Sequence, residues 1–148
     1  MITLLQGGDI ELNPGPASAA CKCLNICHVN IRSLSRGKLL AIQTTLANLY
    51  DIITISETHL HPWVGNYLFQ LKGYHKILRK DRDGNGGRIA MFIKDNISFK
   101  RLHRYEKPEL EAMWVSVNSI QGKLLICCCY RPPDKKEFWT DFGNNLDD

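Results

Sequence analysis

Residues 51–57 read Asp-Ile-Ile-Thr-Ile-Ser-Glu, and this short stretch predicts a central strand. Its centre is β-branched and almost entirely apolar, which is typical of a strand that is buried on both faces of a sheet. A carboxylate, Glu57, follows at the point where the strand stops. We therefore expect a central strand that delivers an acidic side chain to one rim of a sheet.

Further elements are predicted on both sides of this strand. Residues 24–29 are a short apolar run that ends at Asn30, and residues 38–50 carry Leu and Ile at helical spacing after a candidate cap, Ser35. A last helix is expected from about Asp134 onward. The remaining strands should form two hairpins, 74–78 with 89–94 around a glycine-rich turn, and 113–117 with 123–130 before two prolines. This order predicts a mixed α/β (α+β) fold with a largely antiparallel portion.

Length and composition are those of one globular domain. A chain of 148 residues with 44% hydrophobic residues can bury a substantial core, roughly 70% of its unfolded surface. No apolar run approaches the ~18 residues needed to cross a bilayer, so no membrane partner is expected. Six cysteines without a secretory signal indicate reduced thiols in the cytosol or nucleus.

The cluster Cys21, Cys23, Cys27 and His28 raises the question of a zinc site. Its spacing matches no paired Cys-x-x-Cys arrangement, and alternate residues of a strand point to opposite faces. A zinc site there would need ligands from elsewhere, so we favour the interpretation without zinc.

Positive charge is concentrated in one part of the chain. The net charge is +4, but residues 72–107 hold eleven Lys and Arg against four Asp and Glu, a local excess of seven. Such a cluster favours a polyanion, because binding to phosphates releases counterions. A solvated hairpin surface explains the same charges, and charge alone leaves the two interpretations open.

Residues 9–16, Asp-Ile-Glu-Leu-Asn-Pro-Gly-Pro, resemble the signature of 2A-like ribosome-skipping peptides. The resemblance implies that the ribosome does not form the bond between Gly15 and Pro16, whereas the simpler interpretation is a proline turn. It implies domain bounds of 1–15 for the skipping peptide, 16–23 for a linker and 24–148 for the folded domain. The skipping residues would be Asp9, Glu11, Asn13, Pro14, Gly15 and Pro16.

Three further strings resemble the endonuclease/exonuclease/phosphatase superfamily, and most of all the apurinic-type endonuclease domain of non-LTR retrotransposons. They are Asn-Ile-Arg-Ser-Leu at 30–34, Ser-Glu-Thr-His-Leu at 56–60 and Tyr-Arg-Pro-Pro at 130–133. A skipping peptide before such a domain also resembles certain animal retrotransposons. The fold implied is a partial four-layered β-sandwich flanked by helices.

The resemblance also implies roles for individual residues. Asn30 and Glu57 would be catalytic residues that bind Mg²⁺ or Mn²⁺, and Tyr130 would be a catalytic residue that approaches the scissile phosphate. The chemistry agrees, since Mg²⁺ prefers oxygen ligands and is commonly held by one or two carboxylates plus a phosphate. Taken singly, the three side chains have plainer interpretations as a turn residue, a solvated cap and a rim aromatic. Arg32, His59 and Arg131 lie beside these motifs as candidate contacts to nucleic-acid phosphates, although solvated surface explains them equally well.

Two later strings of this family, Gly-Asp-x-Asn and Ser-Asp-His, do not occur in the chain. We therefore expect the carboxyl-terminal half of the domain to be missing and the fragment to be inactive alone. The leading hypothesis is the amino-terminal portion of a metal-dependent endonuclease that nicks DNA for reverse transcription, with the reverse transcriptase of the same element as a partner. It would be made in the cytoplasm and act in the nucleus. The alternatives are an inactive remnant that binds nucleic acid weakly and, with less support, a phosphatase or phospholipase relative.

Overall fold

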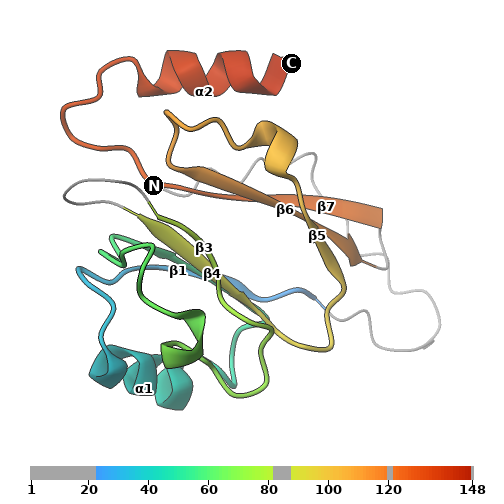
Figure 1. Ribbon diagram of the computed structural model, residues 1–148. Helices are drawn as coiled ribbons and strands as arrows, with labels where there is room; N and C mark the ends of the chain where they lie inside the picture. The colour runs from blue at the N-terminus through green and yellow to red at the C-terminus, as the bar shows by residue number, and fades with distance from the viewer. Residues whose placement is uncertain (1–22, 82–87, 120–121, 148) are drawn as a thin grey trace.

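The computed structural model describes residues 23–81, 88–119 and 122–147. Within them the chain forms two β-sheets, with one helix on the outer side of each (Figure 1). Neither helix of this part is long and apolar enough to cross a membrane. The skipping peptide, most of the linker, Cys21 and the glycine-rich turn at 83–87 lie outside the described residues.

The first sheet contains the predicted central strand, residues 52–56. Its strand order is β1-β2-β4-β3. β1 and β2 are parallel, while β4 is antiparallel to both β2 and β3. The strands are β1 Ile26–Asn30, β2 Ile52–Ser56, β3 Leu78–Lys80 and β4 Ile89–Ile93. Helix α1, Arg36–Thr45, connects β1 to β2. Ser35 is its N-cap, and the Ser35 hydroxyl accepts a hydrogen bond from the Lys38 backbone N–H.

The second sheet is an antiparallel meander with the strand order β5-β6-β7. Its strands are β5 Phe99–Arg101, β6 Ala112–Ser119 and β7 Gly122–Cys129. Helix α2, Phe138–Asp147, follows β7 and lies on the opposite side of this sheet from the first sheet (Figure 1). Short 3₁₀ turns lie at η1 Asn66–Leu68 and η2 His103–Tyr105.

The core consists of layers on both faces of the first sheet. Ile53 and Ile55 of β2 join the apolar cluster that includes Ile42 of α1. Ile52, on the other face of β2, joins the cluster between the two sheets with Val115 of β6. All five residues of β2 are buried. The prediction of a strand buried on both faces is confirmed, as is the mixed α/β class.

Three predicted boundaries were wrong. The first helix ends at Thr45 instead of residue 50, and the Thr45 hydroxyl donates back to the Ala41 carbonyl in its last turn. Residues 74–78 are not the strand of the first hairpin, because β3 begins only at Leu78. Tyr74 forms an isolated antiparallel bridge with Lys94, the residue after β4. The Tyr74 hydroxyl instead donates to the carbonyls of Ala47 and Tyr50, which holds this segment against the end of α1.

The last helix begins at Phe138, four residues after its expected start near Asp134. Residues 133–134 and 136–137 are turns. The backbone N–H of Lys135 donates to the carbonyl of Pro132 at 3.2 Å, which closes a turn in place of a first helical turn. β5 was not predicted at all, because three residues with one apolar member carry no clear alternation.

Candidate active site

Asn30 and Glu57 are brought into direct contact by the parallel pairing of β1 and β2. Asn30 pairs with Ser56 in the strand register, so Glu57 extends just beyond the same rim. The Asn30 side-chain amide donates a hydrogen bond of 2.8 Å from Nδ2 to Oε1 of Glu57. Two side chains that are 27 positions apart in sequence therefore form one polar pair.

The two loops beyond this pair are joined by backbone hydrogen bonds. Ser33 N–H donates to the Glu57 carbonyl at 2.7 Å, and Leu34 N–H donates to the Thr58 carbonyl at 2.8 Å. From α1, the ammonium of Lys38 donates to the carbonyls of Ile31, Arg32 and Ser33 at 2.7, 2.6 and 3.1 Å. The backbone around the pair is thus fixed from two sides.

The same loops contain most of the left-handed backbone conformations among the non-glycine residues that the structure describes. Positive φ angles occur at Arg32 (44°), Ser33 (74°), Glu57 (56°) and His59 (53°). Such angles are uncommon for residues with a Cβ atom and cost of order 1 kcal/mol or more. They persist here because the hydrogen bonds between the loops hold them, and they direct the Glu57 side chain toward Asn30.

Tyr130 lies at the same rim, on the strand end of the other sheet. Its backbone N–H donates to the Glu111 carbonyl at 2.8 Å, and a Glu111 side-chain oxygen accepts from the Arg88 backbone N–H at 2.6 Å. The Arg88 carbonyl in turn accepts from the N–H of Thr58, the residue after Glu57, at 3.1 Å. Figure 1 shows the carboxyl ends of β1 and β7 at the left side of the molecule. The three predicted site residues therefore share one rim.

The donor set suits a hard cation. Glu57 offers a carboxylate and Asn30 an amide oxygen, which accepts a 3.3 Å hydrogen bond from the Arg32 N–H. Among the residues that the structure describes, no three His, Cys, Asp or Glu side chains form a group that could hold a metal ion. Oxygen donors in this small number match Mg²⁺, which keeps several waters and a substrate phosphate in its shell.

Comparison with solved structures identifies the architecture. At a TM-score of 0.59 and 13% identity, 84% of the chain matches 52% of the endonuclease domain of TRAS1, a telomere-specific non-LTR retrotransposon. At 0.56 and 15% identity, 83% of the chain matches 52% of the catalytic domain of Xenopus laevis APE2. The chain has an endonuclease/exonuclease/phosphatase-like fold.

The chain spans about half the length of these two solved domains. A scan against protein-family models gave no match, and neither did a search of curated protein sequences. At this level of identity, the likeness concerns the fold alone.

The candidate phosphate contacts lie next to the site residues in sequence, and therefore near the same rim. Arg32 follows the β1 end, His59 lies two positions after Glu57, and Arg131 follows Tyr130; all three are exposed. All three side chains are therefore accessible to a ligand at this rim.

Three positioning residues escaped the sequence analysis. Lys38 lies on a helix surface in the sequence pattern, and Arg88 and Glu111 stand just before predicted strands without a predicted metal or phosphate role. Arg88 and Glu111 are only 1% and 5% exposed, and together they join the rim of one sheet to that of the other. In the sequence, Arg88 and Glu111 each stand directly before an apolar run. A charged residue at the start of a strand that is expected to be buried is the signal that would have pointed to them.

His28 lies on β1, two residues before Asn30, and its side chain contacts the neighbouring strand β2. Its ring nitrogens lie 3.0 Å from the Thr54 hydroxyl and 3.1 Å from the Ser56 hydroxyl. Burial lowers the pKa of His28 below its ordinary value, which favours the neutral ring. These contacts occupy both ring nitrogens within the β1–β2 pair.

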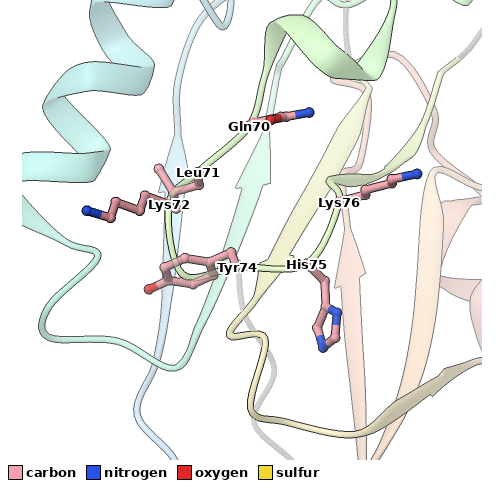
Figure 2. Close-up of a pocket in the computed structure, with 6 residues that line it drawn as sticks. All are labelled: Gln70, Leu71, Lys72, Tyr74, His75 and Lys76. Atoms are coloured by element: carbon pink, nitrogen blue, oxygen red, sulfur yellow. The ribbon is translucent and has the colours of Figure 1, made fainter.

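A surface hollow elsewhere on the molecule is separate from this site. Figure 2 shows its lining, with the Lys72 and Lys76 side chains pointing to opposite sides and the Tyr74 hydroxyl pointing away from Lys76. Tyr74 and His75 are engaged with backbone carbonyls of the core loops. The hollow has none of the metal or phosphate candidates in its lining.

Proposed function

We propose that the chain supplies the metal-binding portion of a DNA endonuclease active site, in which Asn30 and Glu57 bind Mg²⁺ or Mn²⁺ and Tyr130 contacts the scissile phosphate. The observation that carries the proposal is the 2.8 Å hydrogen bond between Asn30 and Glu57 at the rim of an endonuclease-like fold. The TRAS1 domain, an endonuclease of a non-LTR retrotransposon, supports the choice of a retroelement nuclease.

Phosphodiester hydrolysis requires neutralisation of the phosphoryl oxygens and stabilisation of the leaving oxygen. A bound divalent cation would supply that positive charge and orient the phosphate. The Asn30 amide orients the Glu57 carboxylate, and the loop hydrogen bonds keep both groups in place before substrate arrives. The Tyr130 phenol can donate its proton in a hydrogen bond to a phosphate oxygen.

The first test is cation binding, which does not depend on turnover. Titration of the protein with Mn²⁺, followed by the electron paramagnetic resonance signal of free Mn²⁺, should show one site that Mg²⁺ competes for. Glu57→Gln should weaken binding by at least about tenfold, because it removes the charge that attracts the ion. Glu137→Gln, which removes an exposed carboxylate near α2, is the matched control and should change nothing. Equal affinity in wild type and Glu57→Gln would refute the metal role.

The second test is strand nicking by the natural polypeptide that contains these residues. Supercoiled plasmid should be converted to the open circle in Mg²⁺, and both Glu57→Gln and Tyr130→Phe should slow the conversion. Undiminished nicking by Glu57→Gln would contradict the catalytic assignment.

A second candidate function is an inactive fragment that binds nucleic acid weakly. The observation in its favour is the local excess of seven positive charges within residues 72–107. The structure shows that many cations of residues 72–107 are engaged internally, as in the ion pairs Arg79–Asp81, Lys94–Asp51 and Arg101–Glu106. Salt-dependent DNA affinity without nicking would support this candidate.

The biological setting follows as part of the proposal. Skipping on the ribosome at Gly15 and Pro16, action in the nucleus, and cooperation with a reverse transcriptase of the same element all rest on the sequence motifs. Translation of the natural reading frame in a cell-free extract, followed by sequencing of the product's amino terminus, tests the first of these directly. A product that starts at Pro16 is the expected result.

A further inference from the structure

We propose that Trp63 is a stacking platform for an unpaired nucleobase beside the candidate active site. This inference deepens the proposed function, because it names a single-stranded segment of nucleic acid as the ligand of this rim. Trp63 lies six positions after Glu57, and its side chain is 78% exposed. One exposed aromatic residue needs no explanation by itself, so the argument depends on how this one is held.

The indole of Trp63 is stacked on His61. The two ring centroids are 4.2 Å apart and the planes differ by 12°. His61 is fixed in turn by Arg88, whose Nη2 lies 3.2 Å from its Nδ1. An aromatic ring that is supported on one face and exposed to water is ready to accept a flat ring on the other face.

The backbone beneath this stack is also fixed. Arg79 Nη2 donates to the carbonyls of His61 and Pro62 at 3.2 and 3.4 Å, and Val64 N–H donates to the His61 carbonyl at 2.9 Å. Because Arg88 also joins Thr58 and Glu111 through its backbone, the platform is tied to the rim that carries Glu57 and Tyr130. A preorganised ring loses little conformational entropy when it binds.

Charge favours a nucleic acid over an apolar partner at this place. Arg79 and Arg88 both contact the segment of His61 and Pro62, and Asp81 pairs with Arg79 at 3.0 Å. A second exposed aromatic side chain, Tyr67, is 74% exposed, and its ring packs so close over Gly65 that a side chain there would overlap it. Exposed aromatic rings beside cations are the chemistry that single-stranded nucleic acids require.

The test separates base stacking from phosphate attraction. Fluorescence anisotropy would measure binding to labelled oligothymidylate and to an abasic oligomer of the same length, both in EDTA so that no metal site contributes. Trp63→Ala should weaken binding to oligothymidylate by about tenfold and leave binding to the abasic oligomer unchanged. Trp63→Phe should restore most of the affinity, because a flat ring returns. Trp139→Ala, at a tryptophan on α2 that is 40% exposed, is the matched control and should have no effect.

The slope of affinity against salt should be the same for wild type and Trp63→Ala, because phosphate contacts are untouched. An equal loss on both oligomers, an unchanged affinity for oligothymidylate, or a wild-type protein that binds both oligomers equally would each overturn the inference. Loss of Mn²⁺ binding in Glu57→Gln concerns the metal site alone, so failure of the metal proposal and failure of the platform are distinguishable.

Discussion

Lys38 holds the loop after Asn30 through three backbone carbonyls, and its removal should loosen that loop. We expect Lys38→Met to lower the free energy of unfolding by about 1 kcal/mol, because exposed hydrogen bonds from a charged donor contribute modestly. Mn²⁺ affinity should fall several-fold, since Glu57 is positioned by the same loop. Urea denaturation and Mn²⁺ titration measure the two effects. Lys123→Met on β7 is the control, and equal metal affinity in the two variants would exclude the positioning role.

Cys129 should be the most reactive thiol of the consecutive trio on β7. A hydrogen bond from the Cys127 thiol lowers the pKa of Cys129, whereas burial raises the pKa of Cys128 to about 12. Because the thiolate is the nucleophile, Cys129 should react with iodoacetamide at lower pH than its two neighbours. Cys127→Ala should shift the rate profile to higher pH by removing the donor. Peptide mapping by mass spectrometry measures both, and an unchanged profile would contradict the thiol hydrogen bond.

At the scale of residues, the sequence was informative wherever a short string holds the whole signal. Asn30 and Glu57 stand at strand ends in recognisable motifs, and the structure brings them together. Lys38, Arg88 and Glu111 hold the rim through contacts between different segments of the chain. Arg88 and Glu111, for example, are 23 positions apart in sequence. A single sequence contains no direct record of such contacts.

At the scale of elements, Glu111 joins the two sheets where β4 and β6 begin. Glu111→Ala should leave the buried Arg88 N–H without this acceptor and cost about 1–3 kcal/mol of unfolding free energy. Glu111→Gln keeps an oxygen that can accept the bond, so its cost should be clearly smaller. Urea denaturation of both variants checks the prediction. Equal destabilisation by the two substitutions would show that the side-chain acceptor for the Arg88 N–H is not what matters.

Element types were easier to predict than element ends. β2 and the β6–β7 hairpin follow from long apolar runs, which contain enough periodic positions to identify a strand. The first hairpin was misplaced because Tyr74 and Ile77 look like strand residues, although the Tyr74 hydroxyl is used to bind the α1–β2 connection. Tertiary contacts of this kind override local propensity.

At the scale of the whole molecule, β7 forms an edge of the second sheet. Among the described strands it pairs only with β6, and its Leu124 and Leu125 are 39% and 48% exposed. An eight-residue edge strand with exposed apolar side chains is a template for pairing with another chain. We therefore expect the protein to self-associate as its concentration rises, which sedimentation velocity would measure.

A charge on this edge should oppose the association. Leu125→Lys introduces a cation that must be desolvated when two edges pair, so the weight-average mass should shift toward the monomer. Leu40→Lys makes the same change at a side chain of α1 that is 64% exposed, and it should leave the association unchanged. A wild-type protein that stays monomeric over the whole concentration range would mean that β7 is covered in solution. An equal effect of the two substitutions would instead place the contact outside β7, since only a contact through the sheet edge distinguishes Leu125 from Leu40.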